Sequence, residues 1–106
     1  MLIWLAAILF ASVISVCVGD DQSSWTADQD RLTAQIEKSP KSVDLYSRRG
    51  DVRFFLGHFR ETTADYDQMM TLHADLDAEH WRRGIAWFYA GEYEKATGQF
   101  ERYHSF

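Results

Sequence analysis

Two stretches of this 106-residue chain repeat each other at a spacing of 34 residues. The first stretch begins at Tyr46 and the second at His80. Six aligned positions are identical: Arg48 and Arg82, Arg49 and Arg83, Gly50 and Gly84, Phe54 and Phe88, Gly57 and Gly91, and Thr63 and Thr97. A fixed period of this length is typical of helix-turn-helix units that stack and share one core. The repeat therefore predicts an all-α chain built by stacking, a form that presents binding surfaces to other chains.

Glycine marks the ends of two expected helices. Gly57 and Gly91 occupy the same place in the two stretches, and each is expected to terminate a helix. Asp75 and Asp77 are the N-cap candidates for the helix that ends before Gly91. The expected helices are 43–56, 59–72, a third long helix ending near residue 90, and 93 to the end. No segment alternates apolar and polar residues for long enough to predict a strand.

A further helix is expected ahead of the repeated part. Residues 20–25 are polar and are expected to form a linker. Thr26 and Gln29 have the spacing of a capping box, in which each side chain satisfies the other residue's backbone N–H. The helix predicted over 26–39 ends at Pro40, because the residue before a proline avoids the helical region.

Residues 1–19 are apolar and uncharged, and an abrupt polar switch follows them. An apolar core followed by small residues predicts a secretory signal peptide cleaved near Gly19, although no Lys or Arg precedes the core. Two alternatives stay open. The segment is nearly long enough to remain as a membrane anchor, or Cys17 is acylated as in a lipoprotein.

Charge and motif content narrow the function classes. The net charge is −5, and every Asp, Glu, Lys and Arg lies after Gly19. This acidic balance argues against a nucleic-acid partner, because binding the phosphate backbone needs clustered Lys and Arg. Cys17, the only cysteine, lies in the leader, so no cysteine framework follows it. His58, His73, His80 and His104 form no metal-binding pattern and are expected at surface or repeat positions. With no catalytic motif either, we expect no enzyme activity, no metal and no cofactor.

With this layout, residues 43–106 resemble the tetratricopeptide repeat family. Counted from Val43, the family positions hold Tyr46, Gly50, Phe54, Gly57, Phe59, Thr62 and Tyr66. Counted from Asp77, they hold Trp81, Gly84, Trp87 with Phe88, Gly91, Tyr93, Ala96 and Phe100. The resemblance implies a short α-α superhelix of about two and a half repeats: 43–76 as repeat 1, 77–106 as an apparently truncated repeat 2, and 26–39 as a degenerate half-repeat.

The glycines and aromatic residues have a physical meaning at these positions. Gly50 and Gly84 fall in the middle of expected helices, where glycine costs about 1 kcal/mol relative to alanine. Close approach of the paired helix is the compensating reason that we expect. The buried stripe expected on each second helix consists of Phe59 and Tyr66, then Tyr93 and Phe100.

In this family, ligands lie along the concave face that the first helix of each pair forms. The resemblance therefore implies seven partner-binding residues: Asp44, Ser47, Asp51, Phe55, Trp81, Ile85 and Tyr89. Tryptophan and tyrosine are enriched at binding hot spots, so this set favours an apolar peptide or helix. The family's clamp for acidic peptides is absent, because Ser47, Asp51, Trp81 and Ile85 have the wrong chemistry for it.

The resulting hypothesis is an exported, periplasmic or extracellular module that binds a protein or peptide and touches a membrane only through residues 1–19, if these remain. The alternative is an incomplete, self-associating or membrane-anchored structural subunit, or a shortened fragment of a longer repeat protein. It is motivated by the last helix, where an exposed apolar patch is expected from Trp87, Phe100, Tyr103 and Phe106. Self-association would then use this C-terminal helix.

Overall fold

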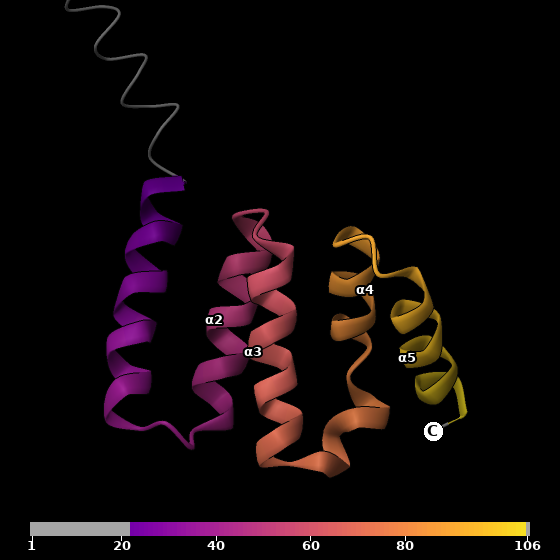
Figure 1. Cartoon of the computed structure of the whole chain (residues 1–106). Helices are drawn as coiled ribbons and strands as arrows, with labels where there is room; N and C mark the ends of the chain where they lie inside the picture. Colours follow the sequence, from indigo (N-terminus) through magenta and orange to yellow (C-terminus); the bar gives the residue numbers. More distant parts are fainter. Residues whose placement is uncertain (1–21, 106) are drawn as a thin grey trace, which may run out of the picture.

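The computed structural model describes residues 22–105, and this part of the chain is helical with no strand. The elements in order are a helix over residues 22–38, α2 (Val43–Phe55), α3 (Phe59–Leu72), the 3-10 helix η1 (Ala74–Glu79), α4 (Trp81–Tyr89) and α5 (Tyr93–Ser105). The helices stand side by side in chain order, and each one runs opposite to the one before (Figure 1). The prediction of an all-α helical repeat is confirmed. The division into units 43–76 and 77–106 stays a prediction.

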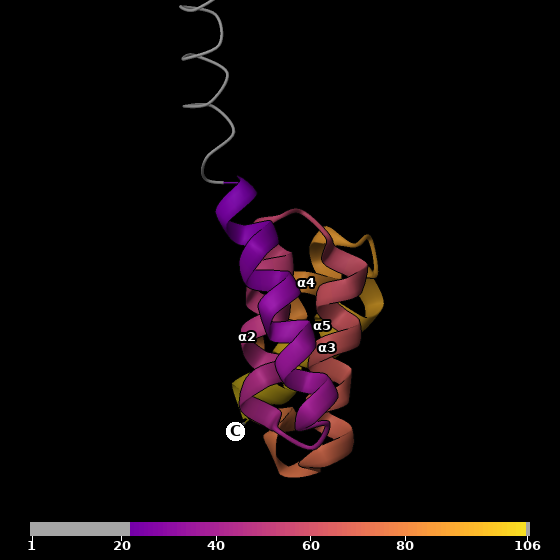
Figure 2. The ribbon, with the colours of Figure 1, turned by 90° about the vertical axis from the view of Figure 1, so that its left-hand side faces the viewer.

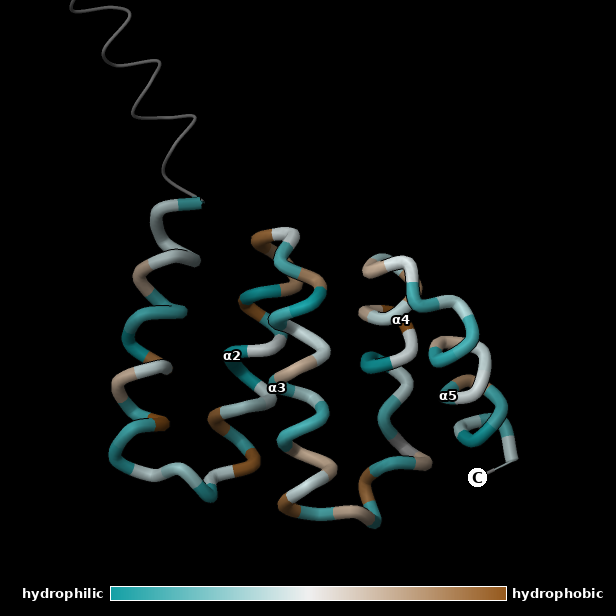
Figure 3. The backbone as a smooth tube through the Cα atoms, in the orientation of Figure 1, coloured by the Kyte–Doolittle hydropathy of each residue, from teal (hydrophilic) through white to brown (hydrophobic). Residues whose placement is uncertain are grey.

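Seen along the row, the helices lie behind one another, with the first described helix in front (Figure 2). Hydrophilic and hydrophobic residues alternate along every helix (Figure 3), as expected when one face packs and the other meets solvent. The core cluster contains Ile36, Tyr46, Tyr66, Met69 and Ala86, so it runs from the first described helix to α4.

Local signals set most of the helix ends. The Ser42 hydroxyl accepts from the Leu45 amide and caps α2. Gly57 and Gly91 have φ of 79° and 85°, a backbone conformation that favours glycine, and they follow the ends of α2 and α4. The predicted limits of α2, α3 and α5 therefore agree with the structure within one or two residues.

The capping box at Thr26 is wrong. The first described helix already includes residues 22–25, which were expected to be linker, and the Thr26 hydroxyl donates to the Gln22 carbonyl within it. A threonine inside a helix makes this bond to the carbonyl four residues earlier, so its hydroxyl no longer serves as a cap. The predicted leader at residues 1–19 lies outside the described residues.

The predicted start of the third long helix is also wrong. Residues 74–79 form η1, and α4 begins only at Trp81, capped by His80 and not by Asp75 or Asp77. Asp77 is occupied elsewhere: its carboxylate pairs with Arg83 and Arg102. A side chain held by two guanidinium groups is not free to accept from the next amides of a helix.

Gly50 and Gly84 lie at helix contacts, as predicted. A Cβ atom built on Gly50 would lie 2.5 Å from the Tyr66 ring, and one on Gly84 would lie 2.6 Å from the Phe100 ring. The helices concerned form two pairs, α2 with α3 and α4 with α5. In each pair, the backbone of the first helix approaches an aromatic ring of the second helix at a distance that only glycine allows.

The expected aromatic stripe is only partly buried. Tyr66 is buried and Phe59 is half-buried, but Tyr93 and Phe100 are exposed, which corrects the prediction for the second pair. The expected exposure of Phe100 and Tyr103 is confirmed, whereas Trp87 is half-buried under the Arg83 guanidinium. Phe106 lies outside the described residues.

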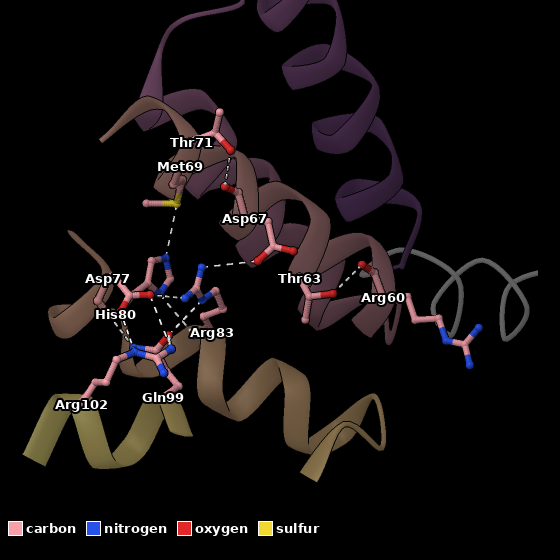
Figure 4. Close-up of polar contacts among 10 residues, drawn as sticks. All are labelled: Arg60, Thr63, Asp67, Met69, Thr71, Asp77, His80, Arg83, Gln99 and Arg102. Atoms are coloured by element: carbon pink, nitrogen blue, oxygen red, sulfur yellow. Dashed lines mark hydrogen bonds and ion pairs between the residues drawn. The ribbon is translucent and has the colours of Figure 1, made fainter. Parts of the chain in front are cut away.

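Two arginines at equivalent positions of the repeat, Arg49 and Arg83, connect neighbouring helices through side-chain hydrogen bonds and ion pairs. Arg49 reaches Asp65 in its own pair and Thr33 in the preceding helix. Thirty-four residues later, Arg83 reaches Gln99 in its own pair and Asp67 in the preceding helix. Figure 4 shows the second of these clusters, with Asp77 and Arg102 around Arg83. Because Gln99 carries no charge where Asp65 does, Arg83 takes its main counter-charge from Asp77 of η1.

None of the helices within residues 22–105 combines the length and apolar character that a bilayer crossing requires. The predicted segment for membrane contact, residues 1–19, falls outside this range.

Candidate functional site

An apolar hollow of about 300 Å³ lies between the first helices of the two pairs, α2 and α4. Seven residues line this hollow, hereafter the groove: Asp51, Phe54, Phe55, Tyr66, Trp81, Arg82 and Ile85. Phe55 at the end of α2 and Trp81 at the start of α4 are 61% and 44% exposed, although both are large apolar residues. Phe55 packs against Trp25 of the first described helix, at 5.2 Å between ring centroids, yet both Phe55 and Trp81 keep surface that another molecule can contact.

The polar residues of the groove satisfy one another. Arg82 donates to both carboxylate oxygens of Asp51 at 2.8 and 2.7 Å, and to the Ser47 hydroxyl at 3.1 Å. The Tyr66 hydroxyl donates a hydrogen bond to the same Asp51 carboxylate. The Arg82 charge is thus balanced inside the protein, which leaves the apolar surface as the part of the groove free for a ligand.

Tyr66 joins the groove to the core. Burial, then the hydrogen bond to Asp51, raises the pKa of the Tyr66 hydroxyl far above its ordinary value. The group therefore stays protonated and serves as a fixed donor. Arg82 lies over the ring of Tyr66 at 5.6 Å from its centroid, so one residue of α3 orders both polar groups at the groove edge.

The structure brings together four of the seven predicted residues: Asp51, Phe55, Trp81 and Ile85 line the groove. Ser47 lies beside them through its bond with Arg82. Their role in partner binding stays a prediction.

The other two predicted residues lie outside the groove. Tyr89 stacks on Phe59 at 5.2 Å and meets Phe54 edge-on at 5.7 Å, so it packs between the two helix pairs. Asp44 pairs with Arg48 on the exposed side of α2. Both positions were carried over from the family's pattern, which does not take account of these aromatic and charged neighbours.

Sequence reasoning missed Arg82 and Tyr66 as groove residues. Arg82 belongs to a repeated Arg-Arg pair, but its partner Asp51 is 31 residues away. In the first pair, the equivalent Arg48 bonds within its own helix. The repeat alone therefore carried no signal for the contact between Arg82 and Asp51.

His80 is the N-cap residue of α4, and its ring packs on the groove residue Tyr66 at 4.5 Å between centroids. His80 is buried at its repeat position, whereas His58, His73 and His104 are exposed. Its Nδ1 accepts from the Arg83 amide at 3.1 Å, which leaves Nε2 as the protonated nitrogen, 3.3 Å from the Met69 sulfur. Burial, with the nearby charges of Arg82 and Arg83, lowers the pKa of His80 to about 4.

His80 is expected to make stability depend on pH. Its pKa is lower in the folded chain than the ordinary 6.5, so between these values the unfolded chain binds more protons. The free energy of unfolding should therefore fall as pH drops from 6.5 towards 4, by up to ~1.4 kcal/mol per pH unit. His80→Asn keeps a capping acceptor but does not titrate, so it should flatten this dependence in urea unfolding at pH 7 and pH 5. His58 is the exposed N-cap residue of α3, so the control His58→Asn should keep the wild-type change of unfolding free energy with pH. An equal pH dependence in the wild type and both variants would contradict the role given to His80.

In the described part of the chain, no group of three His, Cys, Asp or Glu side chains is arranged to hold a metal ion. The ionisable side chains of the groove are bonded to one another, because Asp51 accepts from both Tyr66 and Arg82. What the groove offers chemically is apolar contact area with an ordered polar edge.

The chain is similar in sequence to a known protein over part of its length. No protein-family profile matches the chain. Over 74 residues the chain is 31% identical to a protein described as Protein SGT1 homolog, from Oryza sativa subsp. japonica. The match covers 70% of this chain but only 20% of that protein, so the chain spans about a fifth of its relative's length. The similarity and the all-helical fold are compatible with a protein of the tetratricopeptide type.

Proposed function

We propose that this chain is a non-catalytic interaction module whose groove holds an apolar segment of another protein or peptide. The observation that carries the proposal is the exposure of Phe55 and Trp81 around an apolar hollow whose only arginine is already paired. The similarity to a segment of the SGT1 homolog supports a general protein-interaction role.

The shape of the groove favours an extended or helical ligand segment. Phe55 comes from α2, and Ile85 and Trp81 come from α4, so a bound segment would contact the first helix of both pairs. An aromatic residue that becomes buried removes about 150–250 Å² from water, and tryptophan is the residue type most enriched at hot spots. One or two apolar anchors of a ligand would suffice to occupy a hollow of about 300 Å³.

The charges of the groove disfavour an acidic ligand. Arg82 already donates to both oxygens of Asp51, so a ligand carboxylate would have to compete with that carboxylate and would meet its charge. We therefore expect the selected ligands to have apolar anchors and no required acidic terminus.

Selection from a displayed peptide library with the full chain tests this function. Trp81→Ala and Phe55→Ala should each weaken a selected peptide by about 2 kcal/mol or more, close to 30-fold in Kd. The measurement is fluorescence anisotropy of the labelled peptide, with circular dichroism to show that each variant is folded.

Phe88→Ala is the matched control, because Phe88 is a phenylalanine that is 52% exposed, as Phe55 is 61% exposed, but it does not line the groove. It should leave the affinity unchanged. Full affinity in both groove variants, or an equal loss with Phe88→Ala, would move the binding site away from the groove.

We also propose that residues 1–19 direct export, on the strength of their apolar run and the polar switch after Gly19. Expression of the full chain in a secreting host, followed by N-terminal sequencing, should show a new terminus near Asp20. Exported protein that still begins at Met1 would favour the anchor, and acylation at Cys17 the lipoprotein alternative.

A further inference from the structure

The outer face of α5 corresponds to a face of α3 that the structure shows covered. The 34-residue period relates five residues of α5, here called the α5 face, to five residues of α3: Tyr93 to Phe59, Thr97 to Thr63, Phe100 to Tyr66, Glu101 to Asp67 and Tyr103 to Met69. The chain therefore contains its own example of how such a face is used.

On α3, the cover is the segment that begins with His80 and continues as α4. The His80 ring packs on Tyr66 at 4.5 Å between centroids and reaches the Met69 sulfur. Arg83 crosses to the Asp67 carboxylate at 3.4 Å, as Figure 4 shows.

Two further residues of α4 complete this cover. Tyr89 stacks on Phe59 near the other end of α3, at 5.2 Å between ring centroids. Ala86, between Arg83 and Tyr89, is fully buried in the cluster that holds Tyr66 and Met69. The side of α4 that covers α3 therefore carries a basic residue, Arg83, then a small residue three positions later, Ala86, and an aromatic residue three positions after that, Tyr89.

The same residues of α5 are exposed. Tyr66 is 2% exposed and its counterpart Phe100 is 38% exposed, while Met69 and Tyr103 are 5% and 47% exposed. The inner contact does not explain this difference, because Phe100 packs on Gly84 as Tyr66 packs on Gly50. What differs is the helix on the outer side.

From this correspondence we infer that the α5 face is a docking site for an amphipathic helix of a partner protein that carries the covering pattern of α4. Its basic residue pairs with Glu101, its small residue packs against Phe100, and its aromatic residue stacks on Tyr93. The site is separate from the groove, so the partner helix on α5 and the groove ligand bind to different surfaces.

A peptide copied from this chain is a suitable probe, because residues 74–91 already carry the covering pattern. The peptide is stapled on its solvent side, since a helix this short is marginal in water. Anisotropy of the labelled peptide with the full chain should show saturable binding, weakened about tenfold or more by Tyr93→Ala and by Tyr103→Ala.

A charge exchange sharpens the test. Glu101→Lys in the chain should weaken the peptide, and a peptide carrying Arg83→Glu should recover affinity for that variant. Glu61→Lys in the chain is the matched control and should leave the affinity unchanged, because Glu61 is exposed on α3 and belongs neither to the α5 face nor to the groove. A failure of the groove proposal would appear in the library selection and not in this experiment.

Several results would overturn the inference. One is the absence of saturable binding up to the solubility limit of the stapled peptide. Another is a peptide affinity that neither Tyr93→Ala nor Tyr103→Ala changes. Loss of binding with Asp67→Lys but not Glu101→Lys would mean that the peptide displaces α4 from α3. Dimerisation of the chain that Tyr103→Asp abolishes, seen by analytical ultracentrifugation, would make a second copy the occupant.

Discussion

Replacing Asp65 with alanine is expected to lower the free energy of unfolding by about 3–5 kcal/mol, the cost of breaking a buried ion pair from one side. The Asp65 side chain is 3% exposed and accepts from Arg49 at 2.7 Å and from Arg53 at 3.0 Å. Without it, two mostly buried guanidinium groups would lose their counter-charge. Such a loss is a large fraction of the stability of a domain of this size, and urea unfolding followed by circular dichroism measures it.

Two further variants separate lost charge balance from lost packing. Arg49→Met and Arg53→Met added to Asp65→Ala should recover part of the loss, because no unpaired cation then remains buried. Asp44→Ala breaks the exposed pair with Arg48 and should cost under about 1 kcal/mol. If Asp65→Ala proved as mild as Asp44→Ala, the buried cluster would not stabilise the fold as proposed.

Gly50→Leu is expected to destabilise the chain by about 3 kcal/mol, at the upper end of the range for overpacking. The added side chain would meet the Tyr66 ring, which is 2% exposed and is held at its hydroxyl by Asp51. The ring has little room to turn aside, so the two helices must separate. The change would appear as a lower Tm in a thermal melt.

Gly84→Leu is the matched comparison and should cost less, about 1 kcal/mol. It would meet the Phe100 ring in the same way, but Phe100 is exposed and can turn towards solvent. Equal losses at the two glycines would show that the ring of Phe100 is held as firmly as that of Tyr66, which its exposure does not predict.

The two helix-contact glycines also show what sequence reasoning achieved. Gly50 and Gly84 were predicted at helix contacts from their place in the middle of helices, and the structure puts an aromatic ring over each. The groove was predicted less completely. Trp81, Ile85, Phe55 and Asp51 were named from the resemblance and lie together, while Arg82 and Tyr66 were not named because their partners come from other helices.

The sequence by itself determined the features that depend on the chain's own backbone. The helix limits around Gly57 and Gly91 follow from the left-handed conformation that glycine adopts easily, and the end before Pro40 follows from proline's steric demand. The all-α class and the stacking follow from the 34-residue period, because each unit needs a neighbour to bury its apolar side.

Only the tertiary structure decided which neighbour each side chain has. Asp77 has the chemistry of an N-cap, yet Arg83 and Arg102 hold it, so α4 starts at Trp81 under a histidine cap. Tyr66 and Phe100 hold equivalent positions, but α4 covers the first and the described chain leaves the second exposed. Burial and ion pairing are properties of surfaces that meet, and a single sequence read along its length does not specify which surfaces those are.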